Sequence, residues 1–214
     1  MRSDKKSEIK NNASLIMHRF RGYFPVIIDI ETAGFNHQED AILEIAAVTV
    51  KMDEQGFLTI DQEWHNHILP FENANIEKTA LEFLKIRDPF SLLRGAIEEK
   101  EAFNLLFKWI RQQQKENQCK RAILVAHNAM FDLSFINAAI NRNQLKRSPF
   151  HPFSSIDTVA FAALAAQHTV LSKACQNLHI DFDLKKAHNA LYDAKKTAEL
   201  FCTVINQWEK NKSL

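Results

Sequence analysis

An aspartate and a glutamate stand two positions apart inside an apolar stretch. Asp29 and Glu31 belong to the run PVIIDIE (25–31), whose β-branched residues predict a buried strand. Side chains two positions apart on a strand point to the same face, so these two carboxylates should lie side by side. Such a pair is electrostatically costly unless a cation lies between the acids, although a strand end that reaches water would also tolerate it.

Two further aspartates and a histidine occur where helices are predicted to begin. Asp132 falls in the first turn of a helix that Asn128 could cap, where an acid can also simply stabilise the helix dipole. Asp193 lies near the start of the last predicted helix, which Asn189 could cap. His188 then lies in the loop before that helix, and its side chain can either turn over Asp193 or stay in solvent.

The four acids and the histidine together predict one kind of chemistry. Four carboxylates carry a charge of about −4, which two divalent cations neutralise, and oxygen-only ligands favour Mg²⁺ or Mn²⁺ over zinc. Two such ions can stabilise the attacking and leaving oxygens of an in-line phosphoryl displacement, while an imidazole deprotonates the attacking water. The pattern therefore predicts metal-dependent hydrolysis of a phosphodiester.

The composition excludes several other classes of function. The 214 residues carry a formal net charge of +1, so a polyanion would have to be held by local basic patches. No glycine-rich nucleotide loop, G-x-S-x-G elbow, H-E-x-x-H motif or C-x-x-C pair is present. The few cysteines, and the lack of a secretory segment or a long apolar run, predict a cytoplasmic protein without a membrane segment.

The alternation of strand-like and helical segments predicts an α/β fold, a mixed five-stranded sheet with helices on both faces. Three strands joined by short loops should form an antiparallel meander, and two short strands follow between helices. The strands are expected at 25–31, 41–51, 57–69, 122–126 and 154–157, and the longer helices at 76–85, 96–111, 128–141 and 190–208. Residues 1–18 are expected to be a loose tail, and 19–210 a single domain with a helical insertion at about 76–118.

Three segments resemble the motifs of the DEDD exonuclease family. They are VIIDIETAGF (26–35), AHNAMFD (126–132) and AHNALYDA (187–194), and the histidine five positions before the last aspartate marks the His-containing branch. The resemblance covers about residues 19–208 and is strongest to exoribonucleases of the family. It implies a ribonuclease H-like exonuclease fold, a homodimer, and two Mg²⁺ ions for which Mn²⁺ can substitute. It also implies removal of single 3′-terminal nucleotides from transfer RNA and other stable-RNA precursors, and trimming of single-stranded DNA.

The resemblance also implies roles for individual residues. It makes Asp29, Glu31, Asp132 and Asp193 the metal-binding acids and His188 the general base. The family stacks aromatic side chains between the last 3′ bases, at positions that here are Phe35, Phe83, Phe131 and Phe153. The basic residues Arg19, Arg21, Arg121 and Lys146 would contact the RNA stem, each protomer's patch serving the partner's site.

Two positions leave the specificity open. Thr79 stands where the family carries a glutamate that reads the terminal bases, so the base preference is not predicted. Asp157 could support the site from behind, but a helix N-cap is its expected role.

Two other functions compete with the exoribonuclease. A DNA proofreading or repair exonuclease would use the same five site residues. A catalytically silent RNA-binding module could share the fold, but it would gain nothing from four converging carboxylates.

Overall fold

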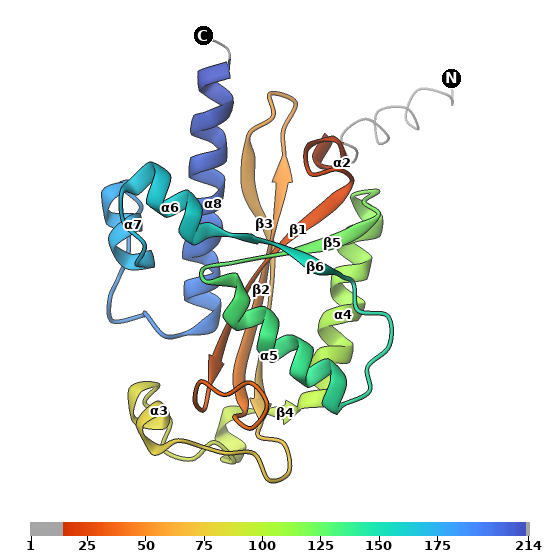
Figure 1. Ribbon diagram of the computed structural model, residues 1–214, viewed down its shortest axis with the longest axis vertical. Coiled ribbons are helices and arrows are strands. Elements are labelled where there is room, and N and C mark those ends of the chain that lie inside the picture. Colours follow the sequence, from red (N-terminus) through yellow and green to blue (C-terminus); the bar gives the residue numbers. More distant parts are fainter. Residues whose placement is uncertain (1–14, 213–214) are drawn as a thin grey trace.

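The computed structural model describes residues 15–212, which form a six-stranded mixed sheet with the strand order β4-β3-β2-β1-β5-β6 (Figure 1). Strands β1, β2 and β3 are antiparallel, whereas β5 and β6 run parallel to β1. The strands are β1 (Tyr23–Thr32), β2 (Ile42–Met52), β3 (Leu58–Leu69), β4 (Ile97–Glu98), β5 (Arg121–Ala126) and β6 (Phe150–Asp157). The predicted meander and the mixed α/β class are therefore confirmed.

Helices cover both faces of this sheet. The long C-terminal helix α8 packs across β1, β2 and β3, while α4 and α5 pack against the other face, over β5 and its neighbours. The helices are α2 (Leu15–Arg19), α3 (Lys78–Phe83), α4 (Glu99–Glu116), α5 (Ala129–Arg142), α6 (Thr158–Ala166), α7 (Leu171–Asn177) and α8 (Ala190–Lys212), with a 3₁₀ turn at Leu92–Arg94. Among the described residues no helix is long and apolar enough to cross a membrane.

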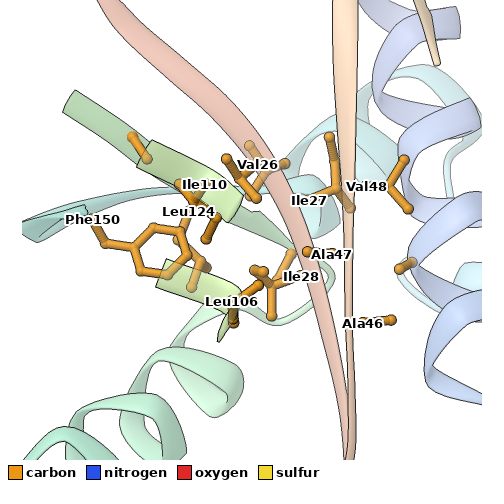
Figure 2. Packing of buried hydrophobic residues seen from close by; sticks show 14 of the residues in the cluster. Val26, Ile27, Ile28, Ala46, Ala47, Val48, Leu106, Ile110, Leu124 and Phe150 are labelled. Atoms are coloured by element: carbon orange, nitrogen blue, oxygen red, sulfur yellow. The ribbon is translucent and has the colours of Figure 1, made fainter. Parts of the chain in front are cut away.

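The central strand β1 is buried on both faces, and alternate residues serve different layers. Ile28 packs with Leu106 of α4 and Leu124 of β5, whereas Val48 of β2 points toward α8 (Figure 2). Ala46 also points toward α8 and pairs directly with Asp29. Paired residues of antiparallel strands project to the same face, so Asp29 and Glu31 face the side covered by α8.

The insertion between β3 and β5 contains a strand that the sequence pattern did not predict. The expected count of five strands is wrong because Ile97 and Glu98 form the two-residue strand β4, parallel to Ile68 and Leu69 at the end of β3. Helix α4 consequently begins at Glu99 and not at Ala96. Two residues are too few to show a period, so this strand carries no signal of its own.

The expected loose tail at residues 1–18 is partly replaced by structure. Leu15–Arg19 form the short helix α2, in which Ile16 is only 2% exposed and joins the main core. Residues 1–14 lie outside the described part of the chain.

The start of helix α5 is held by a residue other than the predicted cap. Asn128 precedes the helix in a left-handed conformation (φ 70°) and its side chain makes no capping hydrogen bond. The carboxylate of Asp157, at the end of β6, accepts hydrogen bonds from the backbone N–H groups of Asn128 and Ala129 at 3.2 and 3.1 Å. Asp157 also caps its own helix α6 by accepting from Val159 N at 2.9 Å. One carboxylate thus fixes the first turns of two helices.

Candidate active site

The two acids of β1 lie half-buried near the carboxyl end of that strand. Asp29 pairs with Ala46 and Glu31 with Glu44 in the antiparallel register with β2. A methyl group opposite Asp29 leaves space in front of its carboxylate. Strand β1 therefore presents two neighbouring carboxylates to the layer occupied by the start of α8.

Asp132 reaches the same region from the first turn of α5. Strand β5 pairs with β1 only as far as Ile27 and Val125, so the chain leaves β5 just before the acids of β1 are reached. The backbone N–H of Ile30 donates a hydrogen bond to the Asp132 carboxylate. Asp132 is only 4% exposed. This bond places the third carboxylate directly beside Asp29.

The fourth acid and the histidine come from the start of α8. Asn189 caps this helix, as predicted, because its side-chain oxygen accepts from Tyr192 N at 3.0 Å. His188 lies just before the helix in a left-handed conformation (φ 65°), and its backbone N–H donates to Asp193 Oδ2 at 2.8 Å. Donor atoms of Glu31, His188 and Asp193 all lie within 4.8 Å of one another.

The electrostatics show that these acids share one confined space. Burial, and then repulsion by Asp132 and Glu31, raises the pKa of Asp29 well above its ordinary value. Burial and repulsion by Asp193 and Glu44 raise the pKa of Glu31 to about 8. Burial also raises the pKa of both Asp132 and Asp193. Carboxylates in such a cluster ionise together only when cations neutralise them.

The donor set fits hard divalent cations. The four acids offer carboxylate oxygens, the ligands that Mg²⁺ and Mn²⁺ prefer. The second oxygen of Asp193, Oδ1, is buried and has no hydrogen-bond partner within the described chain. A buried anionic oxygen without a partner is the feature that a bound cation would explain. We therefore assign metal binding to Asp29, Glu31, Asp132 and Asp193 as a proposal developed below.

A fifth acid, Glu44, was not among the predicted site residues. It is 6% exposed, lies opposite Glu31 on β2, and contributes to the raised pKa of Asp29, Glu31 and Asp193. Its sequence signal is weaker than that of Asp29 and Glu31, since it is a single acid in the apolar run AILEIAAV. An acid inside a buried strand is itself a signal, but only the register that pairs Glu44 with Glu31 places it at the site.

Three of the four predicted stacking phenylalanines gather around the acids. Phe35 is 84% exposed and its ring centroid lies 6.3 Å from that of Phe131, the neighbour of Asp132. Phe83 is 59% exposed, and its ring centroid lies 4.2 Å from that of His188. Exposed aromatic rings on two sides of the carboxylates form surfaces on which nucleobases could stack.

The fourth, Phe153, lies elsewhere in the described protomer. Its ring contacts His151, which in turn contacts Tyr23 at the opposite end of β1. Six residues of strand separate Tyr23 from Asp29, roughly 20 Å. The structure thus does not bring Phe153 to the acids of its own chain.

The predicted basic residues also gather at the Tyr23 end of β1. Arg21 lies over the Tyr23 ring, with 5.5 Å between its guanidinium carbon and the ring centroid, and Arg121 pairs with Tyr23 across the sheet. Lys146 is exposed in the loop before β6. Arg19 is engaged in an ion pair with Glu209 at 2.7 Å. Patch and acids therefore occupy opposite ends of one strand.

Comparison with known proteins points to a single family. An exonuclease family model, RNase_T, matches residues 26–201. The chain is 58% identical over 201 residues to "Ribonuclease T" of Vibrio parahaemolyticus, covering 94% of each protein. It is 57% identical over 198 residues to "Ribonuclease T" of Shewanella denitrificans, covering 92% of this chain and 87% of that protein.

Solved structures of low sequence identity share the fold. The nuclease domain of 3′hExo, described as a DEDDh family member bound to rAMP, superposes with a TM-score of 0.67 at 19% identity, covering 86% of this chain and 92% of that one. Escherichia coli Exonuclease I in complex with a dT13 oligonucleotide gives 0.66 at 14% identity, covering 89% of this chain and 43% of that one. The chain thus spans less than half the length of the latter enzyme. The predicted resemblance and fold class are confirmed.

Proposed function

The chain belongs to the RNase_T exonuclease family and is a 3′→5′ exoribonuclease, and on this premise we propose that it trims short single-stranded 3′ ends of transfer RNA and other stable-RNA precursors. The observation that carries the proposal is the convergence of four carboxylates and His188 beside exposed phenylalanines. The enzymatic class excludes the silent RNA-binding module.

The four carboxylates would hold two Mg²⁺ ions, for which Mn²⁺ can substitute. When bound, such ions supply electrostatic stabilisation of the attacking and leaving oxygens of the phosphodiester. Asp132 and Asp193 approach from two helix starts and the pair Asp29 and Glu31 from one strand, so the ligands are fixed by separate elements of the fold. Rigid support of this kind keeps the reacting groups in position throughout the reaction.

His188 accepts the proton of the attacking water in the proposed mechanism. Its ring is exposed at the edge of the acid cluster, and its backbone is tied to Asp193. An imidazole in this position can serve as a general base toward that water. The adjacent Phe83 ring limits where the imidazole can move.

The aromatic rings support a single-stranded substrate. Exposed rings such as those of Phe35 and Phe83 can stack on or between unpaired bases without opening a duplex, and every base offers a π-face. Single-stranded DNA satisfies the same requirement, so we propose it as a second substrate. The bound dT13 of the Exonuclease I structure is consistent with this use of the fold.

A homodimer would join the basic patch to the acids. Within one protomer Arg21 and Arg121 lie at the far end of β1 from Asp29, so we propose that they contact the stem of an RNA bound in the partner's site. We place the enzyme in the cytoplasm, where its three free, buried cysteines would stay reduced.

A nuclease assay with matched substrates tests the proposal. We expect a transfer RNA with a short 3′ extension, labelled at its 5′ end, to be shortened one nucleotide at a time in Mg²⁺. The Asp193→Ala variant should bind the same RNA and leave it intact, because its carboxylate would hold metal and not the stem. A single-stranded DNA of equal tail length measures the second activity. A wild-type enzyme that degrades only DNA, or an active Asp193→Ala variant, would refute the assignment.

A further inference from the structure

Glu44 is a buried acid that the proposed reaction does not use. It faces the same side of the sheet as Asp29 and Glu31, and its charge makes ionisation of those acids harder. Placing a fifth carboxylate beside four others is unfavourable unless it makes strong contacts of its own. Its hydrogen bonds show which groups it holds.

The Glu44 carboxylate connects strand β2 to the beginning of α8. Its Oε1 atom accepts a hydrogen bond from Asn189 Nδ2 at 2.9 Å and lies 2.6 Å from Nε2 of His65 on β3. Asn189 also makes two hydrogen bonds to helix α8. Its side-chain oxygen caps the helix, and its backbone carbonyl accepts from Asp193 N at 2.9 Å. The residue held by Glu44 therefore stands between the proposed base and the fourth acid.

The segment that Glu44 holds needs support. His188 has a left-handed backbone conformation, which few residues other than glycine adopt without help from their surroundings. The residues just before it, 183–186, are exposed. The bond from Asn189 to the buried Glu44 is a direct hydrogen-bonded link from this corner to strand β2.

A metal site is the competing explanation of the same cluster. Donor atoms of Glu44, His65 and His67 lie within 4.8 Å of one another. However, the Arg94 guanidinium acts electrostatically on both Glu44 and His67, and it donates to Leu43 O at 2.8 Å, one residue from Glu44. The positive charge that Arg94 already places near this carboxylate disfavours a further cation there and favours a hydrogen-bonded support.

We propose that Glu44 is a positioning residue that ties Asn189, and with it His188 and Asp193, to strand β2. This proposal rests on the proposed role of His188 as the base. Glu44 itself need not touch RNA, metal or the reacting atoms. Its loss should therefore lower the rate of the chemical step and leave substrate binding largely intact.

Steady-state kinetics on a single-stranded oligonucleotide test the proposal. We expect Glu44→Ala to lower kcat by about 10- to 100-fold, the scale of a small misplacement of reacting groups. KM should change by less than about threefold. Glu44→Gln keeps an oxygen that can accept from Asn189 and should restore most of the rate. Glu63→Ala removes an acid of the neighbouring strand β3 that also contacts α8, through Lys195, and serves as the control with normal kinetics.

A double-mutant cycle tests whether Glu44 acts through its hydrogen bond to Asn189 or in another way. If Glu44 acts through Asn189, Asn189→Ser, which keeps an oxygen able to cap α8 but loses the donor to Glu44, should cost little more in the Glu44→Ala background, whereas independent effects would multiply. Hydrogen exchange of residues 184–189 should quicken in Glu44→Ala, a readout that does not depend on activity. The proposal would be overturned if the effects of the two substitutions on kcat multiply, or if kcat is unchanged in Glu44→Ala. It would also be overturned if Glu44→Gln is as impaired as Glu44→Ala and requires more metal.

The failure of this inference can be distinguished from failure of the proposed base. His188→Ala is measured in parallel. A fully active His188→Ala variant would remove the base assignment, and the inference with it. If His188→Ala is impaired and Glu44→Ala is not, the positioning role of Glu44 would be refuted and the base assignment would stand.

Discussion

At the scale of single residues, the histidine before α8 combines an exposed ring with a constrained backbone. His188 is held at φ 65° by the bond from its N–H to Asp193, so its ring stays at the edge of the acid cluster. A base held in this way should affect the chemical step more than it affects binding.

We therefore expect His188→Ala to lower kcat by about 10²- to 10⁴-fold, the usual contribution of a general base. Affinity for a single-stranded 3′ end, measured by fluorescence anisotropy, should stay near that of the wild type. His179→Ala is a matched control, because His179 is also exposed and left-handed, at φ 58°. A His188→Ala variant that keeps its rate and loses affinity would make the histidine a substrate contact.

The crowded acids predict an unusual dependence of stability on pH. The pKa of Glu31 is raised from 4.5 to about 8 by burial and by its acidic neighbours. The folded protein without metal therefore binds more protons than the unfolded chain between these values, and its stability should fall as the pH rises through about 8. Mg²⁺ competes with those protons, so the rise in Tm that it causes should grow with pH.

Thermal melting in EDTA and in Mg²⁺ from pH 5 to pH 9 measures this effect. Glu31→Gln should flatten the metal-free profile, because the neutral amide does not titrate. A metal-free Tm that climbs steadily from pH 5 to pH 8 would contradict the assigned shift.

At the scale of elements, Asp157 couples the end of β6 to the starts of α5 and α6. Its carboxylate accepts from Asn128, Ala129 and Val159, and Asp132 lies in the first turn of α5. We expect Asp157→Ala to lower the free energy of unfolding by about 1–2 kcal/mol, the value of a helix cap, as measured by urea denaturation. Because Asp132 would lose its fixed position, kcat should fall by about tenfold.

Asp53→Ala provides the control for this prediction. Asp53 also accepts two backbone N–H bonds, from Gln55 and Phe57, in a turn between β2 and β3. Its loss should reduce stability and leave kcat unchanged. An Asp157→Ala enzyme that loses kcat as well as stability would support the positioning role, whereas one that loses stability and keeps a normal kcat would refute it.

Local patterns predicted those parts of the site that depend on local geometry. The period of a strand fixes the shared face of Asp29 and Glu31, and the cap at Asn189 fixes the start of α8. Asn128 resembles a cap equally well, but Asp157 supplies the bond from 29 positions away in sequence. A contact of that kind appears only when the sheet brings β5 and β6 together. The separation of Phe153 from the acids likewise depends on strand register and is not visible in the motifs.

At the scale of the whole molecule, the acid cluster and the basic residues lie at opposite ends of strand β1. The acids stand near its carboxyl end, and Arg21 and Arg121 lie near its start. A stem and a 3′ end bound to one protomer would have to span roughly 20 Å between them. A two-fold partner can instead bring its patch to the site, because symmetry repeats every contact.

Complementation between two inactive variants tests this arrangement. One variant carries Asp193→Ala, and the other carries Arg21→Glu, Arg121→Glu and Lys146→Glu. Arg19 is left unchanged because its ion pair with Glu209 would be broken. After denaturation, mixing and refolding, random pairing should restore about a quarter of the wild-type activity on transfer RNA, since half of the dimers each gain one complete site. Mixed dimers that are confirmed by native mass and stay inactive would exclude action across the interface.

The outer edge of β6 also restricts how two protomers can join. Pro152 has no N–H, and the N–H groups of Phe153 and Ser154 both donate to Nδ1 of His151, at 3.4 and 3.0 Å. At the other edge of the described sheet, β4 is only two residues long. Because β4 pairs only with Ile68 and Leu69, most of β3 has no strand on its outer side in the described sheet, whereas the 152–154 segment of β6 offers no row of free donors for strand addition. We therefore expect that two protomers do not join through a sheet that continues across β6, and that this edge is protected from the strand addition that leads to fibrillar aggregation.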